Sequence, residues 1–185
     1  MKVFKTKLKD LFLIEPKVHG DERGYFYELY QFERYNTQGI STSFVQDNRS
    51  YSRKDVLRGI HFQKKRPQGK LVFVTNGAVF DVAVDLRIDS DTFGQFETFL
   101  LSDENKLQVY IPPGFAHGFC VLSDVVEFQY KCSDYYDPTD EGGILWCDPE
   151  LQIPWPISNP IVSDKDNALP CLSQIRSRWP KAGCR

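Results

Sequence analysis

The sequence is poor in the residues that build metal sites and disulfide frameworks. Its 185 residues include three histidines and five cysteines, and no two cysteines form a CxxC pair. An odd, scattered set of cysteines is typical neither of a disulfide framework nor of a thiolate metal site, and it suits a reducing compartment. The cysteines are Cys120, Cys132, Cys147, Cys171 and Cys184.

Long apolar runs are also absent. No stretch approaches about 18 consecutive apolar residues, the length that a membrane-spanning helix needs. The opening segment MKVFKTKLKDLFLIEP is interrupted by charged residues before the apolar region of a signal peptide could form. We therefore expect no transmembrane span, no signal peptide and a cytoplasmic protein.

The sequence has no excess of charge of one sign. Lys and Arg number 23 and Asp and Glu number 25, which gives a formal net charge of −2. The basic residues are spread along the chain, whereas nucleic-acid-binding proteins carry a basic patch or stripe. The sequence therefore predicts no nucleic-acid partner, and any bound anion must be held by a few placed residues.

Aromatic residues make up 14% of the chain and occur with valine in short runs. Such residues favour strands, and turn-forming residues separate the runs at intervals of about ten residues, as in sandwiches and barrels. No GxGxxG motif or alternation of strands with helices occurs, which excludes a Rossmann site. We expect strands over residues 24–30, 70–74, 78–86, 95–101, 107–111 and 125–131, a hairpin turn at Asn76-Gly77, and short helices over 30–36 and 103–107.

No internal repeat or linker is visible, so the sequence predicts a single domain over residues 1–185. Proline becomes frequent from Pro149 to Pro180. We expect this C-terminal segment to wrap the barrel as irregular structure and short helix.

Strand alternation places polar side chains among apolar ones on the same face. Asp81 shares a face with Val79 and Ala83, and Tyr130 shares a face with Phe128. Polar groups that point into a small barrel indicate a ligand cavity rather than a solid core.

His117 ends the segment PPGFAH, whose PxGxxH spacing resembles the second half of the cupin metal motif. The first half of that motif requires HxH, but this chain has His61-Phe62-Gln63 beside several lysines and an arginine. Two histidines are too few for a typical zinc or iron site, and neighbouring cations oppose metal binding. The sequence therefore predicts a cupin barrel with no metal.

Arg58 and His61 have opposite parity in a straight strand. Both side chains can face one cavity only if the chain bends between them, and Gly59 permits a bend or a bulge.

Several segments together resemble one family. DERGYFYE (21–28), FVQDNRS (44–50) and VLRGIHFQ (56–63) are similar, in this order, to the DxRGxFxE, FVQDNxS and VLRGLHFQ motifs of dTDP-4-dehydrorhamnose 3,5-epimerases. The likeness continues through PQGKLV (67–72), FDVAVDLR (80–87), IPPGFAHGF (111–119) and SDKD (163–166), and it covers residues 3–170. Agreement of many ordered motifs is far more specific than one short pattern.

The resemblance implies an epimerase that needs no cofactor. Its substrate is dTDP-4-dehydro-6-deoxy-D-glucose, in which C3 and C5 both lie next to the C4 ketone, and its product is dTDP-4-dehydro-L-rhamnose. The resemblance also implies an all-β jelly-roll cupin barrel of antiparallel strands with a few short helices. It further implies a homodimer in which the N-terminal strand crosses to the partner.

The resemblance assigns the catalytic roles residue by residue. It makes His61 the base, with Asp166 orienting it in preference to Asp164, and an imidazole is a suitable base at physiological pH. Lys70 stabilises the enolate, a role whose loss typically costs roughly 10²–10³ in rate. Tyr130 is the acid on the opposite face of the sugar.

The same resemblance assigns the residues that bind the substrate. Guanidinium groups of Arg23 and Arg58 suit the diphosphate, Tyr136 suits stacking on thymine, and His117 is expected near the C4 oxygen or the hexose. In a dimer, Arg23 and Glu28 are expected to serve the partner's site. Asp81 is a candidate for orienting Lys70 or His117. The expected substrate-binding residues are Arg23, Phe26, Glu28, Gln46, Asp47, Asn48, Arg58, Lys70, His117, Tyr136, Glu141 and Lys165.

Alternative functions remain open at this stage. A single-position epimerase, acting at C3 or C5 of a related nucleotide-linked 4-keto-6-deoxyhexose, would use the same base, acid and enolate stabiliser. A cupin that binds sugar nucleotide without turnover would not need an acid opposite a base. A metal-dependent cupin oxygenase would need a bound transition metal.

Overall fold

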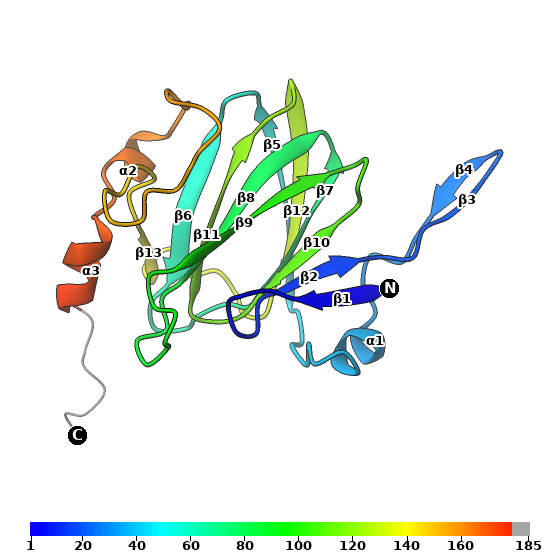
Figure 1. Ribbon diagram of the computed structural model, residues 1–185, viewed down its shortest axis with the longest axis horizontal. Coiled ribbons are helices and arrows are strands. Elements are labelled where there is room, and N and C mark those ends of the chain that lie inside the picture. The colour runs from blue at the N-terminus through cyan, green and yellow to red at the C-terminus, as the bar shows by residue number, and fades with distance from the viewer. Residues whose placement is uncertain (179–185) are drawn as a thin grey trace.

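The structure, a computed structural model, describes residues 1–178. Two antiparallel sheets face each other and enclose the core, and a few short helices lie outside them (Figure 1). The predicted jelly-roll cupin barrel is confirmed. The strands are β1 (Lys2–Lys5), β2 (Phe12–Glu15), β3 (His19–Asp21), β4 (Gly24–Phe26), β5 (Gln46–Arg53), β6 (Leu57–Gln63), β7 (Lys70–Asn76), β8 (Ala78–Asp85), β9 (Phe96–Ser102), β10 (Gln108–Ile111), β11 (Phe115–Val121), β12 (Val125–Cys132) and β13 (Glu141–Gly143), and the helices are α1 (Phe32–Asn36), α2 (Asp164–Asn167) and α3 (Leu172–Arg178).

The two sheets draw on strands from along the whole chain. One has the order β1-β2-β10-β7-β12-β5 and the other the order β13-β6-β11-β8-β9. Strands that follow one another in sequence therefore often lie in opposite sheets, so residues far apart in sequence face the same interior.

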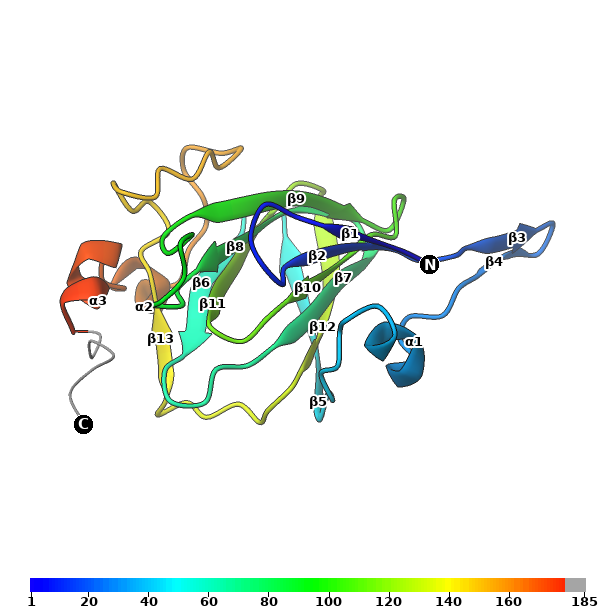
Figure 2. The ribbon, with the colours of Figure 1, turned by 60° about the horizontal axis from the view of Figure 1, so that its bottom comes forward.

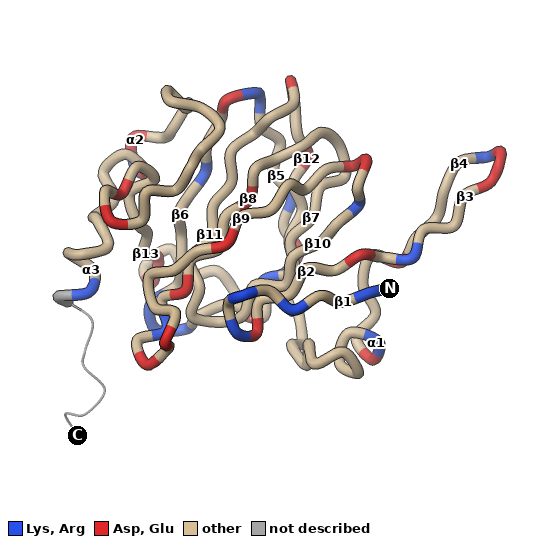
Figure 3. Tube along the Cα trace, viewed as in Figure 1, with Lys and Arg blue, Asp and Glu red and all other residues tan. Residues whose placement is uncertain are grey.

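A small hairpin, β3–β4, projects away from the barrel (Figure 2). Its aromatic side chains are open to solvent, with Tyr25 59% and Phe26 71% exposed. Its charged tip (Figure 3) is held by an ion pair between Asp21 and Arg23, whose atoms Oδ2 and Nη2 lie 2.5 Å apart. An apolar arm of this kind is a candidate for contact with another molecule.

The interior of the barrel changes from apolar to polar at β5. Side chains from β7, β8, β11 and β12 form the main apolar cluster, which includes Val74, Phe119 and Phe128. Along β5, by contrast, the more buried positions are all polar and alternate with exposed ones. This polar face opens the core into a cleft. The polar residues are Gln46, Asn48, Ser50 and Ser52.

Most of the predicted strands are confirmed, and the hairpin turn at Asn76-Gly77 joins β7 to β8. Gly77 has a φ of 85°, and a Cβ there would lie 2.2 Å from the carbonyl oxygen of Val125. Both the backbone conformation and the close contact require glycine.

Two predictions about local structure are wrong. No helix forms over residues 103–107: residues 103–105 form a turn, because the Asn105 side chain accepts hydrogen bonds from the backbone N–H groups of Ser102 and Leu107. The strand predicted over 24–30 ends at Phe26. The chain then returns to the barrel, where the carbonyl of Leu29 accepts from Tyr35 Oη and Gln108 Nε2.

The C-terminal segment lies along the outside of the second sheet, as predicted. The Leu145 N–H donates to the Pro170 carbonyl, and Leu172 packs into an apolar cluster that includes Ile60. Among the described residues, no helix is both long and apolar enough to cross a membrane. Cys184 and the rest of 179–185 lie outside the described residues.

Candidate active site

The cleft contains two adjoining cavities with volumes of about 270 and about 310 Å³. His61, Lys70 and Tyr130 line both cavities, so the three predicted catalytic groups lie where the cavities meet. They come from β6, β7 and β12, three strands of two facing sheets. We name the cavity of about 270 Å³ the outer cavity and that of about 310 Å³ the inner cavity. The outer cavity is also lined by Gln46, Asn48, Phe62, Gln63, Gln68, Cys132, Tyr136 and Glu141, and the inner one by Ser50, Arg58, His117, Phe119, Phe128, Ser163, Lys165 and Asp166.

His61 is paired with Asp166. Its Nε2 lies 2.7 Å from Asp166 Oδ1, and the other carboxylate oxygen accepts from the Gly59 N–H at 3.2 Å. Burial alone would raise the pKa of Asp166, but the bonds from His61 and Gly59 together lower it. The group is therefore a carboxylate, which holds the ring and leaves Nδ1 as the nitrogen available to a substrate.

A bulge turns both Arg58 and His61 toward the cleft. The pairing of β11 with β6 shifts between His117↔His61 and Phe119↔Arg58. Gly59 lies at this shift with a φ of 121°, and a Cβ there would be 2.6 Å from Gly118 Cα. The bend at Gly59 that the sequence allowed is thus confirmed, and only glycine fits it.

Lys70 lies at the start of β7, half-buried between the two cavities. Burial is the main influence on its pKa and lowers it, whereas the nearby Cys132, Asp81 and Glu141 act in the opposite direction. Its Nζ lies 6.0 Å from the centre of the Tyr130 ring. An ammonium group in such a site can stabilise an oxyanion strongly because little water competes with it.

Tyr130 faces the cleft from β12. Burial is the main cause of its raised pKa, with the nearby Cys132 adding to the shift and Arg58 opposing it. The phenol therefore keeps its proton well into the alkaline range and can act as an acid toward an enolate.

His117 forms a second histidine–carboxylate pair, on the strand next to that of His61. Its Nε2 lies 2.7 Å from Asp81 Oδ2, and both side chains are buried. The His117 ring stacks on Phe128, with the ring centres 5.9 Å apart. His117 lines the inner cavity only.

The outer cavity is bordered by a chain of hydrogen bonds around Tyr136. Tyr136 Oη donates to Glu141 Oε2 at 2.6 Å, and Glu141 also pairs with Lys165. The Tyr136 N–H donates to Gln46 Oε1 at 2.9 Å, and Gln46 Nε2 donates to Asn48 Oδ1 at 2.9 Å. The exposed Tyr136 ring is thus held at the cleft entrance by several predicted site residues.

Other predicted binding residues lie outside the cleft of a single chain. Arg23 is on the projecting hairpin, paired with Asp21. Phe26, Glu28 and Asp47 line a separate hollow, which shares Asn48 and Tyr130 with the cleft. Asp47 pairs with Lys131, with Oδ1 and Nζ 2.8 Å apart. Their assignment to the substrate remains a prediction.

Two glutamines that line the cleft are absent from the predicted binding residues. Gln63 exchanges hydrogen bonds with the backbone of Asp137, at 3.0 and 3.1 Å, and so ties β6 to the loop that carries Tyr136. Gln68 donates to the Asp134 carbonyl at 2.7 Å and holds the other side of that loop. Gln63 ends the motif VLRGIHFQ and Gln68 lies in the motif PQGKLV, and this position within the motifs could have indicated that both belong to the site.

The described residues contain no cluster of three or more His, Cys, Asp or Glu side chains placed to hold a metal ion. His61 and His117 are register partners on the neighbouring strands β6 and β11. Each instead pairs with a carboxylate through Nε2.

Comparison with known proteins agrees with this geometry. The family described as dTDP-4-dehydrorhamnose 3,5-epimerase matches residues 5–174. A relative of that name from Salmonella typhimurium is 52% identical over 177 residues, which cover 94% of this chain and 97% of the relative. A crystal structure of a dTDP-6-deoxy-D-glucose-3,5-epimerase from Legionella pneumophila, in complex with dTDP-4-keto-L-rhamnose, is 51% identical with a TM-score of 0.92, and the match covers 96% of this chain and 95% of that one.

A further relative carries a different name. A dTDP-4-dehydrorhamnose 3-epimerase from Streptomyces niveus is 41% identical over 165 residues, which cover 88% of this chain and 80% of the relative. The chain thus resembles the named 3,5-epimerase from Salmonella more closely than this named 3-epimerase.

Proposed function

The chain belongs to the dTDP-4-dehydrorhamnose 3,5-epimerase family, and we propose that His61, Lys70 and Tyr130 carry the chemistry of that isomerase reaction in this protein. The enzyme inverts C3 and C5 of dTDP-4-dehydro-6-deoxy-D-glucose and yields dTDP-4-dehydro-L-rhamnose. The observation that supports these assignments is the meeting of the three side chains at the junction of the two cavities.

The first step removes a proton next to the ketone. Nδ1 of the neutral His61 ring takes the proton from C3 or C5, and the electrons of the broken C–H bond move to form an enolate with negative charge on O4. Asp166 holds the opposite nitrogen and stabilises the imidazolium that forms, because the ring is bonded to it at 2.7 Å.

The second step returns a proton to the other face. The Lys70 ammonium stabilises the negative O4 while the enolate exists. Tyr130 then donates its phenolic proton to the carbon from the face opposite His61, and the configuration inverts. Proton exchange with water restores the imidazole and the phenol before the second carbon reacts.

Binding of the nucleotide is assigned to the cleft entrance. Tyr136 stacks on thymine, with Gln46, Glu141 and Lys165 fixing its position, and Arg58 meets the diphosphate. Asn48 and His117 contact the sugar end.

We also propose a homodimer in which the β3–β4 hairpin reaches the partner's cleft. The hairpin's exposed Tyr25 and Phe26 support this, because an apolar projecting arm loses little by packing against a second protein surface. In that arrangement Arg23, Phe26 and Glu28 would complete the neighbouring site.

The unpaired cysteines Cys120 and Cys132 are consistent with a cytoplasmic location.

Solvent deuterium exchange tests the proposed function. The purified protein is incubated with dTDP-4-dehydro-6-deoxyglucose in D₂O, and the sugar is read by mass and NMR. Deuterium at both C3 and C5 is the expected result. Deuterium at one carbon would assign the protein to single-position epimerisation, as the name of the Streptomyces niveus relative describes, and no deuterium would indicate binding without turnover.

A further inference from the structure

Asp81 is a buried carboxylate that the reaction steps above do not use. It is 0% exposed, and its Oδ2 lies 2.7 Å from His117 Nε2. Its other oxygen, Oδ1, is buried with no hydrogen-bond partner in the part of the chain that the structure describes. A buried carboxylate with one oxygen left without a partner is costly, so packing alone gives no reason for an aspartate in the middle of β8.

The ring of His117 is held from two directions. Phe128 stacks on its face, with planes inclined by 22°, and Asp81 is bonded at its edge. Nδ1 makes no hydrogen bond within residues 1–178, although the residue lines the inner cavity beside Lys70. One nitrogen of the ring is therefore committed and the other is left for a ligand.

The bond to Asp81 decides which ring nitrogen of His117 carries the hydrogen. An ionised carboxylate only accepts hydrogen bonds, so Nε2 must carry a hydrogen. In the neutral ring Nδ1 then has a lone pair and accepts a hydrogen bond. A ketone oxygen has no hydrogen to give, whereas the hydroxyl groups of a hexose do.

We propose that Asp81 is a positioning residue of the epimerase, which fixes His117 so that Nδ1 accepts a hydrogen bond from a hexose hydroxyl. This inference rests on the proposed function. It refines the expectation that His117 lies near the C4 oxygen or the hexose. With its hydrogen on Nε2, the neutral ring can accept a hydrogen bond from a hydroxyl but cannot donate one to the ketone oxygen from Nδ1. The C4 oxygen is left to Lys70.

The charges around the Asp81–His117 pair are consistent with this role. Burial is the main influence on Lys70 and lowers its pKa, but the negative charge of Asp81 is among those that raise it again. Arg58 and Lys165 add positive charge to the same inner cavity, and Asp166 adds negative charge. Asp81 thus also keeps an anionic group near the buried ammonium.

The first experiment uses the unaltered protein. Because the chain has three histidines, ¹⁵N NMR of histidine-labelled protein can resolve each ring, and the His117→Gln variant identifies the His117 signals by their loss. We expect His117 in its neutral form to carry hydrogen on Nε2 and none on Nδ1. A neutral ring with its hydrogen on Nδ1 would overturn the proposal without any variant at position 81.

The second experiment compares two buried aspartates on one strand. Asp81→Asn keeps the size of the side chain but can donate to Nε2 and so release the tautomer, and we expect kcat to fall about 100-fold. The affinity for dTDP, which lacks the hexose, should stay within about twofold. The His117 ¹⁵N signals should change as well.

Asp85 provides the matched control because it is also 0% exposed and lies on the same face of β8. Its carboxylate bonds Arg87, Ser90 and Thr92 instead of a cleft residue. Asp85→Asn should lower the melting temperature but leave kcat within about twofold. An equal loss of kcat in both variants, or none in Asp81→Asn, would reject the positioning role. Lack of deuterium exchange by the unaltered enzyme would instead count against the proposed function, and the NMR result would stand independently.

Discussion

His61 Nε2 and Asp166 Oδ1 lie 2.7 Å apart although 105 residues separate them in the chain. Asp166 reaches this position from α2, where the Ser163 side chain accepts from its N–H at 3.1 Å and begins the helix. The Ser-x-x-Asp segment is thus both a helix start and the support of the proposed base.

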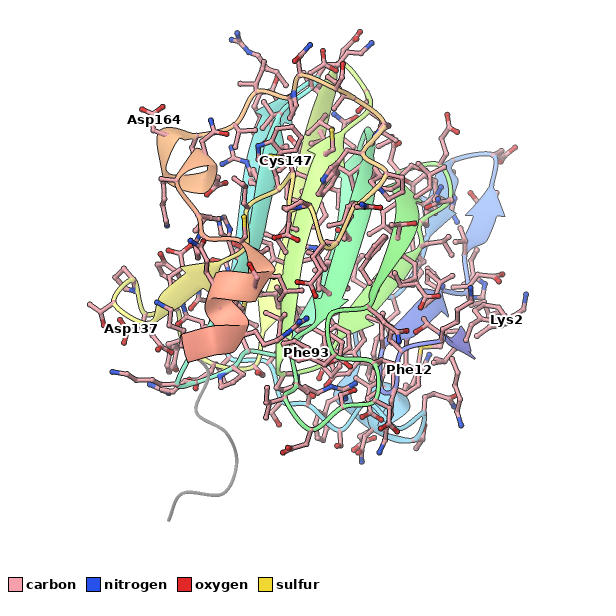
Figure 4. All side chains as sticks on the ribbon, turned by 60° about the vertical axis from the view of Figure 1, so that its left-hand side comes forward. Lys2, Phe12, Phe93, Asp137, Cys147 and Asp164 are labelled. Atoms are coloured by element: carbon pink, nitrogen blue, oxygen red, sulfur yellow. The ribbon has the colours of Figure 1, made fainter. Side chains whose placement is uncertain are left out.

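Replacing Asp166 with asparagine should slow proton abstraction. The amide cannot stabilise an imidazolium, and it can present an N–H where the ring needs an acceptor, so we expect deuterium exchange to fall by about 10² or more. Asp164→Asn is the control, because Asp164 lies on the same helix but at its outer surface (Figure 4). Equal loss in the two variants would contradict the orienting role of Asp166.

Replacing Tyr130 with phenylalanine should separate exchange from inversion. Phenylalanine keeps the ring but has no proton to deliver, so abstraction by His61 continues and the enolate is reprotonated mostly on the original face. NMR should show deuterium entering the substrate faster than epimerised product forms. Tyr135→Phe, at a residue 64% exposed, should behave like the unaltered enzyme. Full inversion by Tyr130→Phe would remove the acid assignment.

The alkaline side of the pH profile should report Lys70. Burial is the leading cause that lowers its pKa below the ordinary 10.5. The active form is the ammonium, so kcat/KM should be full below the lowered pKa and should fall as the pH rises through it. Tyr130 keeps its proton over this range because its pKa is raised.

Lys70→Arg distinguishes this assignment, because a guanidinium stays charged at any working pH. We expect a slower enzyme whose kcat/KM no longer falls on the alkaline side. The same decline in the variant as in the unaltered enzyme would show that another group titrates.

The proposed arm exchange makes a prediction about mixed dimers. Arg23→Ala and His61→Ala should each be poorly active alone. In a dimer of one with the other, the cleft that keeps His61 meets the unaltered hairpin of its partner, so one complete site forms. After random subunit exchange we expect roughly a quarter of the unaltered activity to return. If mixing restores nothing, the hairpin does not serve the partner's cleft.

Much of this protein can be predicted from sequence because the relevant forces act locally. Alternation of side chains placed Asp81 and Tyr130 on inward faces, and both are confirmed to face inward. Asn76-Gly77 specified a turn because few other residues adopt its backbone angles. Gly59 indicated a bend, and the shift of register at that point is the bend. Two short segments are exceptions. Residues 27–30 follow the hydrogen bonds that Tyr35 and Gln108 donate to the Leu29 carbonyl, and residues 103–107 follow the hydrogen bonds that the Asn105 side chain accepts.

The order of motifs and the alternation within strands were thus enough to predict the barrel and the family, and they supplied the candidate groups of its site. Only the tertiary structure decided how those groups combine: that two cavities meet at His61, Lys70 and Tyr130, that a second histidine is bonded to Asp81, and that the β3–β4 hairpin projects away from the barrel. The reason is physical. Turns and strand faces are set by neighbours in sequence, whereas pairing across the barrel depends on the register of strands that lie far apart along the chain.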